Sequence, residues 1–353
     1  MRVLAICDDF IVRDVVEPSL EALSKELSIE FETHFSYLNW PTEPFKFTDE
    51  IGEFVGDPEE TAALIESVDP HVLIVHMAPL SSAVLSRAKS LRAIAVTRGG
   101  PININVRAAT RRGIPVFSTP GRNAETVAEF TVGLIIAHLK HIAVAHAALS
   151  QGNWRTDLYH YTNAAVELGG KTLGVIGFGA IGRRVVKMFS GFDLRFLVVD
   201  PHVQDKSAFG EEVRFVSFDE ALSESDILSL HARVTPETAG MIGEKELRKM
   251  KPTSHLINTA RGPLVDYQAL YKALVEGWIA GAALDTFAVE PPSASDPLLK
   301  LPNVTLTPHI AGSSRETVHR AIDQLTAELA RFLRTGDTSS AMNFRDLAGA
   351  SNA

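Results

Sequence analysis

The chain of 353 residues contains a single cysteine, Cys7, so it cannot form an internal disulfide bond, which fits a reducing compartment. Basic residues are in deficit: 34 lysines and arginines stand against 43 acidic residues, and the net charge of −9 gives no support for nucleic-acid binding. No apolar run approaches the ~20 residues of a membrane helix, and acidic Asp8 and Asp9 follow the short apolar N-terminal run, unlike a signal peptide. These absences predict a cytoplasmic globular protein without membrane or nucleic-acid partners.

Two common kinds of site are missing as well. The sequence has no G-x-S-x-G nucleophile motif and no cysteine pair that could hold zinc. His138, His141 and His146 lie on a long apolar segment without a carboxylate at ligand spacing, so we interpret them as buried or interface residues. We therefore expect no metal site.

The length suits two domains, and short apolar runs alternate with helical patterns in both halves of the chain. This alternation predicts an α/β protein with two doubly wound parallel sheets, Rossmann-like or flavodoxin-like, and a cleft between the two domains. The predicted strands are 2–6, 71–76, 91–96, 114–119, 172–176, 194–199, 213–216, 227–231, 255–259, 280–284 and 304–307.

The segments between these strands give further expectations. Helical patterns cover 17–27, 81–90 and 106–113, and 36–58 resembles an irregular surface insertion. Residues 124–149 predict one long helix, apolar on nearly all faces and therefore buried between domains or subunits. An amphipathic helix over 314–335 should pack back on the first domain, and the polar tail after Asp337 should be poorly ordered.

A glycine-rich turn predicts a dinucleotide site. Gly177, Gly179 and Gly182 have the G-x-G-x-x-G spacing between an apolar strand and an amphipathic helix. The first glycine allows the tight turn, the second lets the pyrophosphate approach the backbone, and the third allows close packing of helix and strand. Asp200 ends the next strand, where a carboxylate would bind the ribose hydroxyls and repel a 2′-phosphate. No arginine follows it directly, so NAD is favoured over NADP.

Three later strands end in residues suited to hydride chemistry. Arg261 follows strand 255–259, Asp285 and Glu290 follow strand 280–284, and His309 follows strand 304–307. Parallel strands gather ligand-binding residues at their carboxyl ends. An arginine can clamp a carboxylate, a histidine can exchange a proton with a hydroxyl, and a neighbouring carboxylate orients that histidine. The combination predicts hydride transfer at a carbon next to a carboxylate.

With these residues in place, the chain resembles the NAD-dependent D-isomer-specific 2-hydroxyacid dehydrogenases over roughly residues 70–335. The likeness is carried by "GIPVFSTPGRNAETVAEF", "LGGKTLGVIGFGAIGRRV", "INTARGPLVDYQAL", "AGAALDTFAVEPP" and "LPNVTLTPHIAGSS". The resemblance implies that Arg261 binds the substrate carboxylate, His309 is the acid/base, Glu290 is its partner, and Asp285 holds the nicotinamide carboxamide.

The resemblance also implies the organisation of the protein. Residues 1–118 plus 309–353 would form the substrate-binding domain and 119–308 the NAD-binding domain, in a homodimer joined through 124–149 and the segment after it. The residues expected to contact NAD are Gly177, Phe178, Gly179, Ala180, Ile181, Gly182, Asp200, His231, Ala232, Arg233, Thr238, Thr259, Ala260, Asp285, His309 and Gly312.

The resemblance implies a 2-hydroxy or 2-keto acid as the substrate and leaves the nature of its side chain open. Arg98, Gly99 and Gly100 join Arg261 and His309 as expected substrate-binding residues: the two glycines fall on the family's carboxylate-binding amides. Arg98 falls where a glycine is usual, so it either pairs with a nearby acid or meets a second polar group on the substrate, as in a sugar acid.

Several departures and alternatives remain. Arg233 replaces a usual proline, and "VHMAPL" (75–80) lacks the arginines that phosphoglycerate enzymes carry there, so phosphoglycerate is possible but not favoured. Glu290 argues against formate as substrate, because formate dehydrogenases have glutamine at that position. Two other functions stay open: an NAD(H)-sensing protein similar to co-repressors, and a phosphite- or formate-type oxidoreductase.

Overall fold

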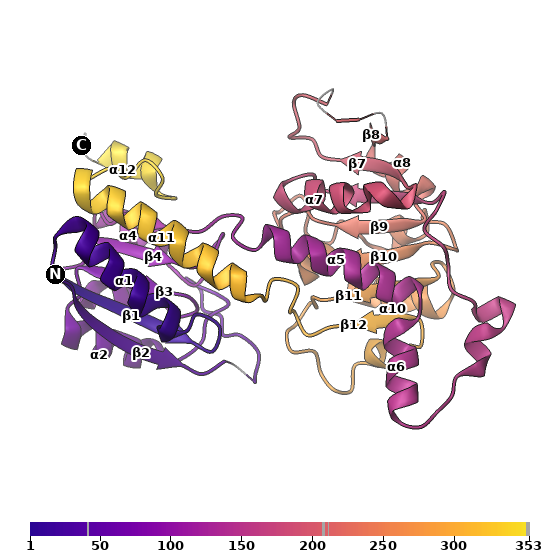
Figure 1. Ribbon diagram of the computed structural model, residues 1–353, viewed down its shortest axis with the longest axis horizontal. Coiled ribbons are helices and arrows are strands. Elements are labelled where there is room, and N and C mark those ends of the chain that lie inside the picture. The colour runs from indigo at the N-terminus through magenta and orange to yellow at the C-terminus, as the bar shows by residue number, and fades with distance from the viewer. Residues whose placement is uncertain (41, 207–208, 211, 351–353) are drawn as a thin grey trace. The chain divides into compact units, whose positions relative to one another are not determined.

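The computed structural model describes residues 1–40, 42–206, 209–210 and 212–350, without the side chains of 348–350 (Figure 1). The chain divides into two compact units. Unit 1 comprises Met1–Arg122 and Ser314–Ala353, and unit 2 comprises Asn123–Ser313. Each unit holds one parallel sheet, so the predicted α/β class with two parallel-sheet domains is confirmed.

Unit 1 is built on a five-stranded parallel sheet in the order β2-β1-β3-β4-β5. In this doubly wound order, successive strands are added on one side of β1 and then, from β3 onward, on its other side. The strands are β1 (Arg2–Asp8), β2 (Glu32–Leu38), β3 (Val72–Val75), β4 (Ala93–Val96) and β5 (Val116–Phe117). The helices are α1 (Arg13–Leu27), α2 (Pro58–Val68), α3 (Ser82–Arg87), α4 (Val106–Arg111), α11 (Arg315–Thr335) and α12 (Phe344–Ala350).

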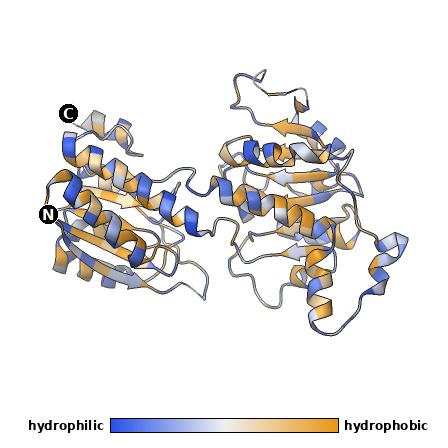
Figure 2. Ribbon diagram, in the orientation of Figure 1, coloured by the Kyte–Doolittle hydropathy of each residue, from blue (hydrophilic) through white to orange (hydrophobic). Residues whose placement is uncertain are grey.

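Helices cover both faces of this sheet. Val3, Ala5 and Cys7 of β1 pack with the apolar stripes of α1 and α11, so the predicted packing of the last long helix on the first domain is confirmed. Leu4 and Ile6, which alternate with them, pack with residues of α2, α3 and α4. Burial on both faces explains the continuous apolar run of β1. Apolar residues follow the strands of the sheet in Figure 2.

Two predictions for unit 1 need correction. Residues 36–58 are not wholly an irregular surface insertion, because β2 extends to Leu38 and Ile51 and Phe54 are buried. Pro41 lies outside the described residues. The tail after Asp337 is not uniformly loose: Ala341 is buried in the core, and Asn343 donates a hydrogen bond to the Ile114 carbonyl oxygen at 2.9 Å and accepts one from the Val116 N–H. Residues 351–353 of that tail lie outside the described residues.

Unit 2 carries a seven-stranded parallel sheet in the order β12-β11-β10-β9-β6-β7-β8. The chain starts in β6, proceeds outward through β7 and β8, and returns to continue from β9 on the other side, as in a Rossmann sheet. The strands are β6 (Thr172–Ile176), β7 (Arg195–Val199), β8 (Val213–Phe215), β9 (Ile227–Leu230), β10 (His255–Asn258), β11 (Gly281–Leu284) and β12 (Val304–Leu306). All seven were predicted. The helices are α5 (Ala124–Leu139), α6 (Ile142–Ser150), α7 (Ala180–Phe189), α8 (Phe218–Glu224), α9 (Glu244–Leu247) and α10 (Tyr267–Val275).

The predicted long helix over 124–149 is wrong as a single element. It is two helices, α5 and α6, bent by 68° at the break between Leu139 and Ile142. His141 lies in the left-handed region with φ of 56°, which no helix continues through. Only α5 is buried as expected, since α6 has no buried residue. Within the described chain, no single helix is long and apolar enough to cross a membrane; the bent pair meets that criterion only when its two helices are taken together.

The two units divide a few residues later than the predicted domain limits. The turn 119–122 stays in unit 1 because the Thr119 N–H donates to the Arg98 carbonyl at 3.0 Å and Arg320 donates to the Arg122 carbonyl at 2.8 Å. Residues 309–313 stay in unit 2 because the loop after β12 is bonded to Asp285 at its start. His309 is therefore part of the same unit as Arg261 and Glu290.

Candidate active site

The glycine-rich turn between β6 and α7 has the steric form that its spacing predicts. Gly177 has φ of +93°, and a Cβ there would lie 2.7 Å from the backbone N of Ala232. A Cβ at Gly182 would lie 2.3 Å from the Gly177 carbonyl oxygen, so helix and turn touch. By contrast, a Cβ at Gly179 would meet nothing within 4 Å. The backbone at Gly179 is therefore open to a ligand at the N-terminus of α7, where helix N–H groups favour phosphate.

Asp200 closes this turn from the end of β7. Its Oδ2 accepts a hydrogen bond of 2.7 Å from the Phe178 N–H, and its Oδ1 accepts one of 2.8 Å from the His202 N–H. Each oxygen retains a free lone pair, and the carboxylate is only partly buried. The carboxylate is thus fixed next to the turn and can still accept from a ligand hydroxyl.

Arg261 stands on a loop that is tightly constrained on both sides. The Asn258 side chain at the end of β10 donates to the Arg261 carbonyl at 3.0 Å and accepts from the Ala260 N–H at 3.1 Å. A Cβ at Gly262 would lie 1.8 Å from the Phe287 carbonyl oxygen, so this loop rests on the loop after β11. The Arg261 guanidinium itself is exposed and bonds only to the Ala260 carbonyl, at 2.8 Å, within the described chain. It is held in place by its backbone and is available to an anion.

Asp285, at the end of β11, organises the loop that carries the histidine. The carboxylate is fully buried and accepts from the Thr307 hydroxyl at 2.7 Å and from the N–H groups of Ile310 and Ala311, both at 2.9 Å. The Asp285 carbonyl also accepts from the His309 N–H at 2.8 Å. These bonds hold His309 at φ of 54°, a conformation that is uncommon for a residue other than glycine.

His309 and Glu290 form an ion-pair contact of 2.5 Å between Nδ1 and Oε2. The other carboxylate oxygen, Oε1, accepts from the Phe287 N–H at 2.9 Å, which fixes the glutamate. With Nδ1 engaged, Nε2 is the ring nitrogen that faces away from the carboxylate. The histidine side chain is 37% exposed, so Nε2 can exchange a proton with a small molecule.

The other residues expected at the cofactor lie at the carboxyl end of the same sheet or in the loops after it. His231 follows β9, and its Nε2 lies 2.9 Å from the Ser229 hydroxyl; burial lowers the pKa of His231 to about 4, so the ring is neutral. Thr238 donates to the Arg233 carbonyl at 2.6 Å, while the Arg233 side chain is exposed. The Thr259 hydroxyl lies 2.7 Å from that of Thr131. A Cβ at Gly312 would approach the Asn123 amide to 2.8 Å.

In unit 1, the residues predicted to bind substrate have different surroundings. The Arg98 guanidinium forms an ion pair with Glu53, and Nη1 also donates to the Glu53 carbonyl at 3.2 Å and to Asn103 Oδ1 at 3.3 Å. The ion-pair reading of Arg98 is therefore the one its contacts favour. Gly99 packs on the next turn, since a Cβ would lie 3.2 Å from Pro120 Cα, whereas a Cβ at Gly100 would meet nothing within 4 Å.

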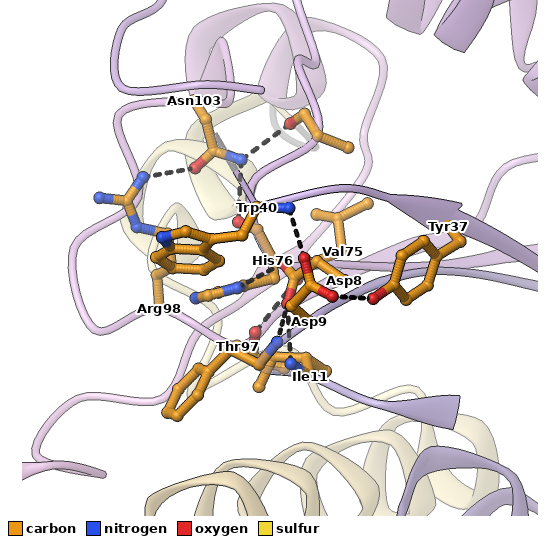
Figure 3. A network of polar contacts seen from close by, with 12 residues as sticks. Asp8, Asp9, Ile11, Tyr37, Trp40, Val75, His76, Thr97, Arg98 and Asn103 are labelled. Atoms are coloured by element: carbon orange, nitrogen blue, oxygen red, sulfur yellow. Dashed lines mark hydrogen bonds and ion pairs between the residues drawn. The ribbon is translucent and has the colours of Figure 1, made fainter. Parts of the chain in front are cut away.

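A buried polar cluster in unit 1 was not predicted. His76 Nδ1 lies 2.7 Å from Asp8 Oδ2, and Arg122 Nη2 lies 3.4 Å from His76 Nε2. Both Asp8 and His76 are buried, and the ring of Trp40 stacks on the imidazole (Figure 3). The Phe10 ring also packs on the imidazole, with ring centroids 5.8 Å apart. Asp8 ends β1 and His76 follows β3, the two strands between which the winding reverses. The apolar strands ending in Asp and His were visible in the sequence, but the adjacency of these strands was not.

Of the three histidines in the α5–α6 segment, His138 has the buried position that was expected, whereas His146 is exposed. His138 is buried, with Nε2 at 3.0 Å from His255 Nδ1 and Nδ1 at 2.9 Å from the Thr305 hydroxyl. Burial lowers the pKa of His138 to about 3 and that of His255 to about 4, so both rings are neutral. Among the described residues, no group of three histidine, cysteine or acidic side chains could hold a metal ion.

Comparison with known proteins shows which family the chain resembles. The family model "D-isomer specific 2-hydroxyacid dehydrogenase, NAD binding domain" matches residues 132–311. The chain is 37% identical to a glyoxylate reductase of Korarchaeum cryptofilum over 92% of each chain. It is also 37% identical to a hydroxypyruvate reductase of Thermotoga maritima, over 78% of this chain and 89% of the relative. The crystal structure of a glyoxylate reductase from Paecilomyes thermophila superposes with a TM-score of 0.77 at 27% identity, covering 98% of this chain and 99% of that one.

The family model covers more than half of the chain and coincides with the sheet that carries the glycine-rich turn, Arg261, Glu290 and His309. The open backbone at Gly179 and the fixed carboxylate of Asp200 fit the dinucleotide that the model's description names. The chain therefore belongs to the NAD-dependent D-isomer specific 2-hydroxyacid dehydrogenases.

Proposed function

We propose that this protein interconverts a D-2-hydroxy acid and its 2-keto acid, with His309 as the acid/base and Arg261 as the carboxylate-binding residue. The observation that carries the proposal is the 2.5 Å contact between His309 Nδ1 and Glu290 Oε2, in the same unit as the exposed guanidinium of Arg261. An exposed cation in the same unit as an oriented imidazole suits an anionic substrate that gains or loses a proton.

His309 would move the proton of the substrate hydroxyl. In reduction, Nε2 donates a proton to the keto oxygen as that oxygen gains negative charge; in oxidation, Nε2 takes the hydroxyl proton. Glu290 accepts from Nδ1–H in both directions, so it sets the tautomer and stabilises the charged ring. The bond from the Phe287 N–H keeps the glutamate from turning away.

Arg261 would bind the substrate carboxylate in a bidentate manner and polarise the neighbouring carbonyl. The constraint imposed by Asn258 and Gly262 supports this role, because a clamp must hold the reacting carbon in place. In unit 1, the open backbone at Gly100 suits a second contact with the carboxylate, with Gly99 beside it.

Residues of the β6–α7 turn would hold the pyrophosphate of NAD, and Asp200 would accept from the adenosine ribose hydroxyls. When bound, NAD supplies the nicotinamide that gives or accepts the hydride. Asp285 is the proposed contact of the carboxamide. Its carboxylate accepts three hydrogen bonds. Because the two oxygens of a carboxylate offer about four lone pairs, one further hydrogen bond remains available.

The direct test follows NADH absorbance with glyoxylate, hydroxypyruvate, pyruvate and larger 2-keto acids, for the natural chain and for His309→Ala. We expect reduction of at least one keto acid, and a loss of about 10²–10⁴-fold in turnover in the variant. If no keto acid is reduced faster than by His309→Ala, the proposal fails. NADH binding without any turnover would then favour an NADH-sensing protein.

We also propose that the protein is a homodimer in a reducing cytoplasm. Helix α6 exposes Ile142 and Leu149, and the segment after it exposes Trp154 by 75% and Tyr159 and Tyr161 by 97% each. Such a patch suits a second copy of this chain. Sedimentation should give a dimer for the natural chain and a monomer for a Tyr159→Glu/Tyr161→Glu variant; a monomeric natural chain would refute it.

A further inference from the structure

The guanidinium of Arg122 in unit 1 is a partly buried cation whose charge is incompletely compensated. Its Nη2 donates to His76 Nε2 at 3.4 Å, its plane lies over the Phe10 ring at 5.5 Å, and its buried Nη1 has no hydrogen-bond partner. No carboxylate lies within ion-pair distance of it among the described residues. A buried charge without an ion-pair partner lowers the free energy of unfolding unless a bound anion neutralises it.

The neighbouring carboxylate is already committed elsewhere. Asp8 Oδ1 accepts from the N–H groups of Phe10 and Ile11 at 2.9 and 2.7 Å, and Oδ2 bonds to His76 Nδ1. Asp8 and Arg122 therefore contact opposite nitrogens of one imidazole. For Arg122 to donate to Nε2, His76 must be neutral with its proton on Nδ1, and burial lowers the pKa of His76 in agreement. The Asp8–His76 pair thus positions Arg122 rather than neutralising it.

Other features of the cluster show that the cation is poorly compensated. Burial lowers the pKa of Arg122 to about 10 and the nearby Arg98 guanidinium acts in the same direction, while the Asp8 carboxylate opposes this shift only in part. Arg98 has Glu53 as its ion-pair partner, whereas Arg122 has none. The buried Thr119 hydroxyl, at the start of the turn that carries Arg122, also lacks a hydrogen-bond partner.

The position of the turn connects this cation to the substrate. The Thr119 N–H donates to the Arg98 carbonyl at 3.0 Å, and Gly99 packs on Thr119 and Pro120. The turn of Arg122 is therefore adjacent to the Arg98–Gly100 segment, whose backbone is the proposed contact of the substrate carboxylate. Both lie beyond the carboxyl ends of the strands, where doubly wound sheets bind ligands.

We propose that Arg122, positioned by His76 and Asp8, binds a second anionic group of the substrate. The substrate is then a dianionic 2-keto or 2-hydroxy acid, with a distal carboxylate or phosphate. The inference rests on the proposed function and narrows its substrate class. Arg122 thus replaces Arg98 as the residue expected to bind a second polar group of the substrate, because Arg98 pairs with Glu53.

The test compares matched keto acids that differ in the distal charge: oxaloacetate with 2-oxobutyrate, and phosphohydroxypyruvate with hydroxypyruvate. The two pairs distinguish a carboxylate from a phosphate. In Arg122→Gln, kcat/KM for the dianion relative to its partner should fall by about 30-fold or more. Arg122→Lys should retain part of the preference, because its charge remains. Arg87→Gln, which removes an exposed cation paired with Glu66 in the same unit, serves as the control.

Three outcomes overturn the inference: no dianion preference in the natural chain, an unchanged ratio in Arg122→Gln, or an equal loss for both members of a pair. Equal loss would assign Arg122 to the common carboxylate or to folding. Thermal unfolding separates these: loss of an uncompensated cation should leave the stability unchanged or raise it, whereas a structural arginine would lower it.

A binding measurement keeps this inference distinct from the proposed function. In a Trp154→Phe/Trp278→Phe background, Trp40 is the only tryptophan, and its ring lies 6.1 Å from that of His76. Malonate and inorganic phosphate should change its fluorescence saturably at constant ionic strength, acetate should not, and Arg122→Gln should abolish the change. If no keto acid is reduced but this binding holds, the proposed function fails and the anion site remains. If malonate and phosphate also fail to bind, the anion site is refuted.

Discussion

Gly262 lies so close to Phe287 that a methyl group on its Cα would overlap the Phe287 carbonyl oxygen. The contact joins the loop of Arg261, which follows β10, to the loop of Glu290, which follows the neighbouring strand β11. Arg261, the proposed carboxylate-binding residue, and Glu290, the proposed partner of the histidine, are therefore spaced by a backbone contact rather than by side chains.

Replacing this glycine should disturb the reaction more than the fold. In Gly262→Ala the two loops must separate, and a displacement of about 1 Å can cost 10²-fold in rate. We expect kcat/KM for the best keto acid to fall by about that factor, measured by NADH oxidation. Gly169→Ala, at an exposed glycine where a Cβ meets nothing within 4 Å, is the matched control. Equal activity of Gly262→Ala and the control would show that the spacing does not matter.

Glu290 should act only through His309. Glu290→Gln keeps an oxygen for the Phe287 N–H but turns an amide NH₂ toward Nδ1, so the ring loses its acceptor. We expect kcat to fall by about 10–100-fold with little change in KM, because a charge-assisted hydrogen bond is lost. In His309→Ala, adding Glu290→Gln should lower the rate no further. Additive losses would place Glu290 in direct contact with the substrate.

Asp200 should set the preference for NADH over NADPH. Asp200→Ala removes acceptors for the ribose hydroxyls and the negative charge that would repel a 2′-phosphate. We expect NADH binding to weaken by about 10–100-fold, the range for hydrogen bonds to a charged group, and NADPH binding to weaken less or to improve. Titration of nucleotide fluorescence measures both. Asp219→Ala, at an exposed ion pair with Lys249, should change neither; a parallel loss of both nucleotides in Asp200→Ala would indicate a damaged turn.

The neutral pair His138–His255 should make the protein sensitive to acid. Both pKa values in the fold lie below that of an unfolded histidine, 6.5, at about 3 and about 4. The unfolded chain therefore binds more protons than the folded chain below pH 6.5. The contribution of the two neutral histidines to the free energy of unfolding is fully present above pH 6.5 and is lost as the pH falls toward 4. By pH 4.5 the loss should be on the order of 2 kcal/mol per histidine. Denaturant unfolding of His138→Gln should show a flatter dependence between pH 6.5 and 4.5; an unchanged slope would contradict the assignment.

The strongly apolar strands could be predicted because burial on both faces leaves a clear sequence pattern. Strand β2 and helix α2 were not predicted. Strand β2, Glu32–Leu38, is an edge strand with no fully buried residue, so its composition is mixed. Helix α2 does carry a signal that could have been used: Asp57 is its N-cap and accepts from the N–H groups of Glu59 and Glu60, with Pro58 at the first turn. The break at His141 has no such signal, since neither proline nor glycine stands there.

The proposed site residues of unit 2 could be selected because each stands at the end of a strand that the pattern reveals or in the loop after it. The cluster in unit 1 required knowledge of which strands are neighbours. Asp8 and His76 are separated by 68 positions and meet only because β1 pairs with β3. Likewise, the partner of Arg98 is Glu53, in a segment with no regular element, 45 positions away.

The boundary at Ser313 has a consequence for how such an enzyme could diversify. Because Asp285 binds the segment that follows β12, His309, the proposed acid/base, belongs to the unit of the NAD-binding sheet rather than to unit 1. The proposed proton exchange and the proposed selection of the acid are thus assigned to different parts of the sequence. A chimera that keeps 123–313 and takes the remainder from a relative should inherit its hydride chemistry from the one parent and its choice of acid from the other.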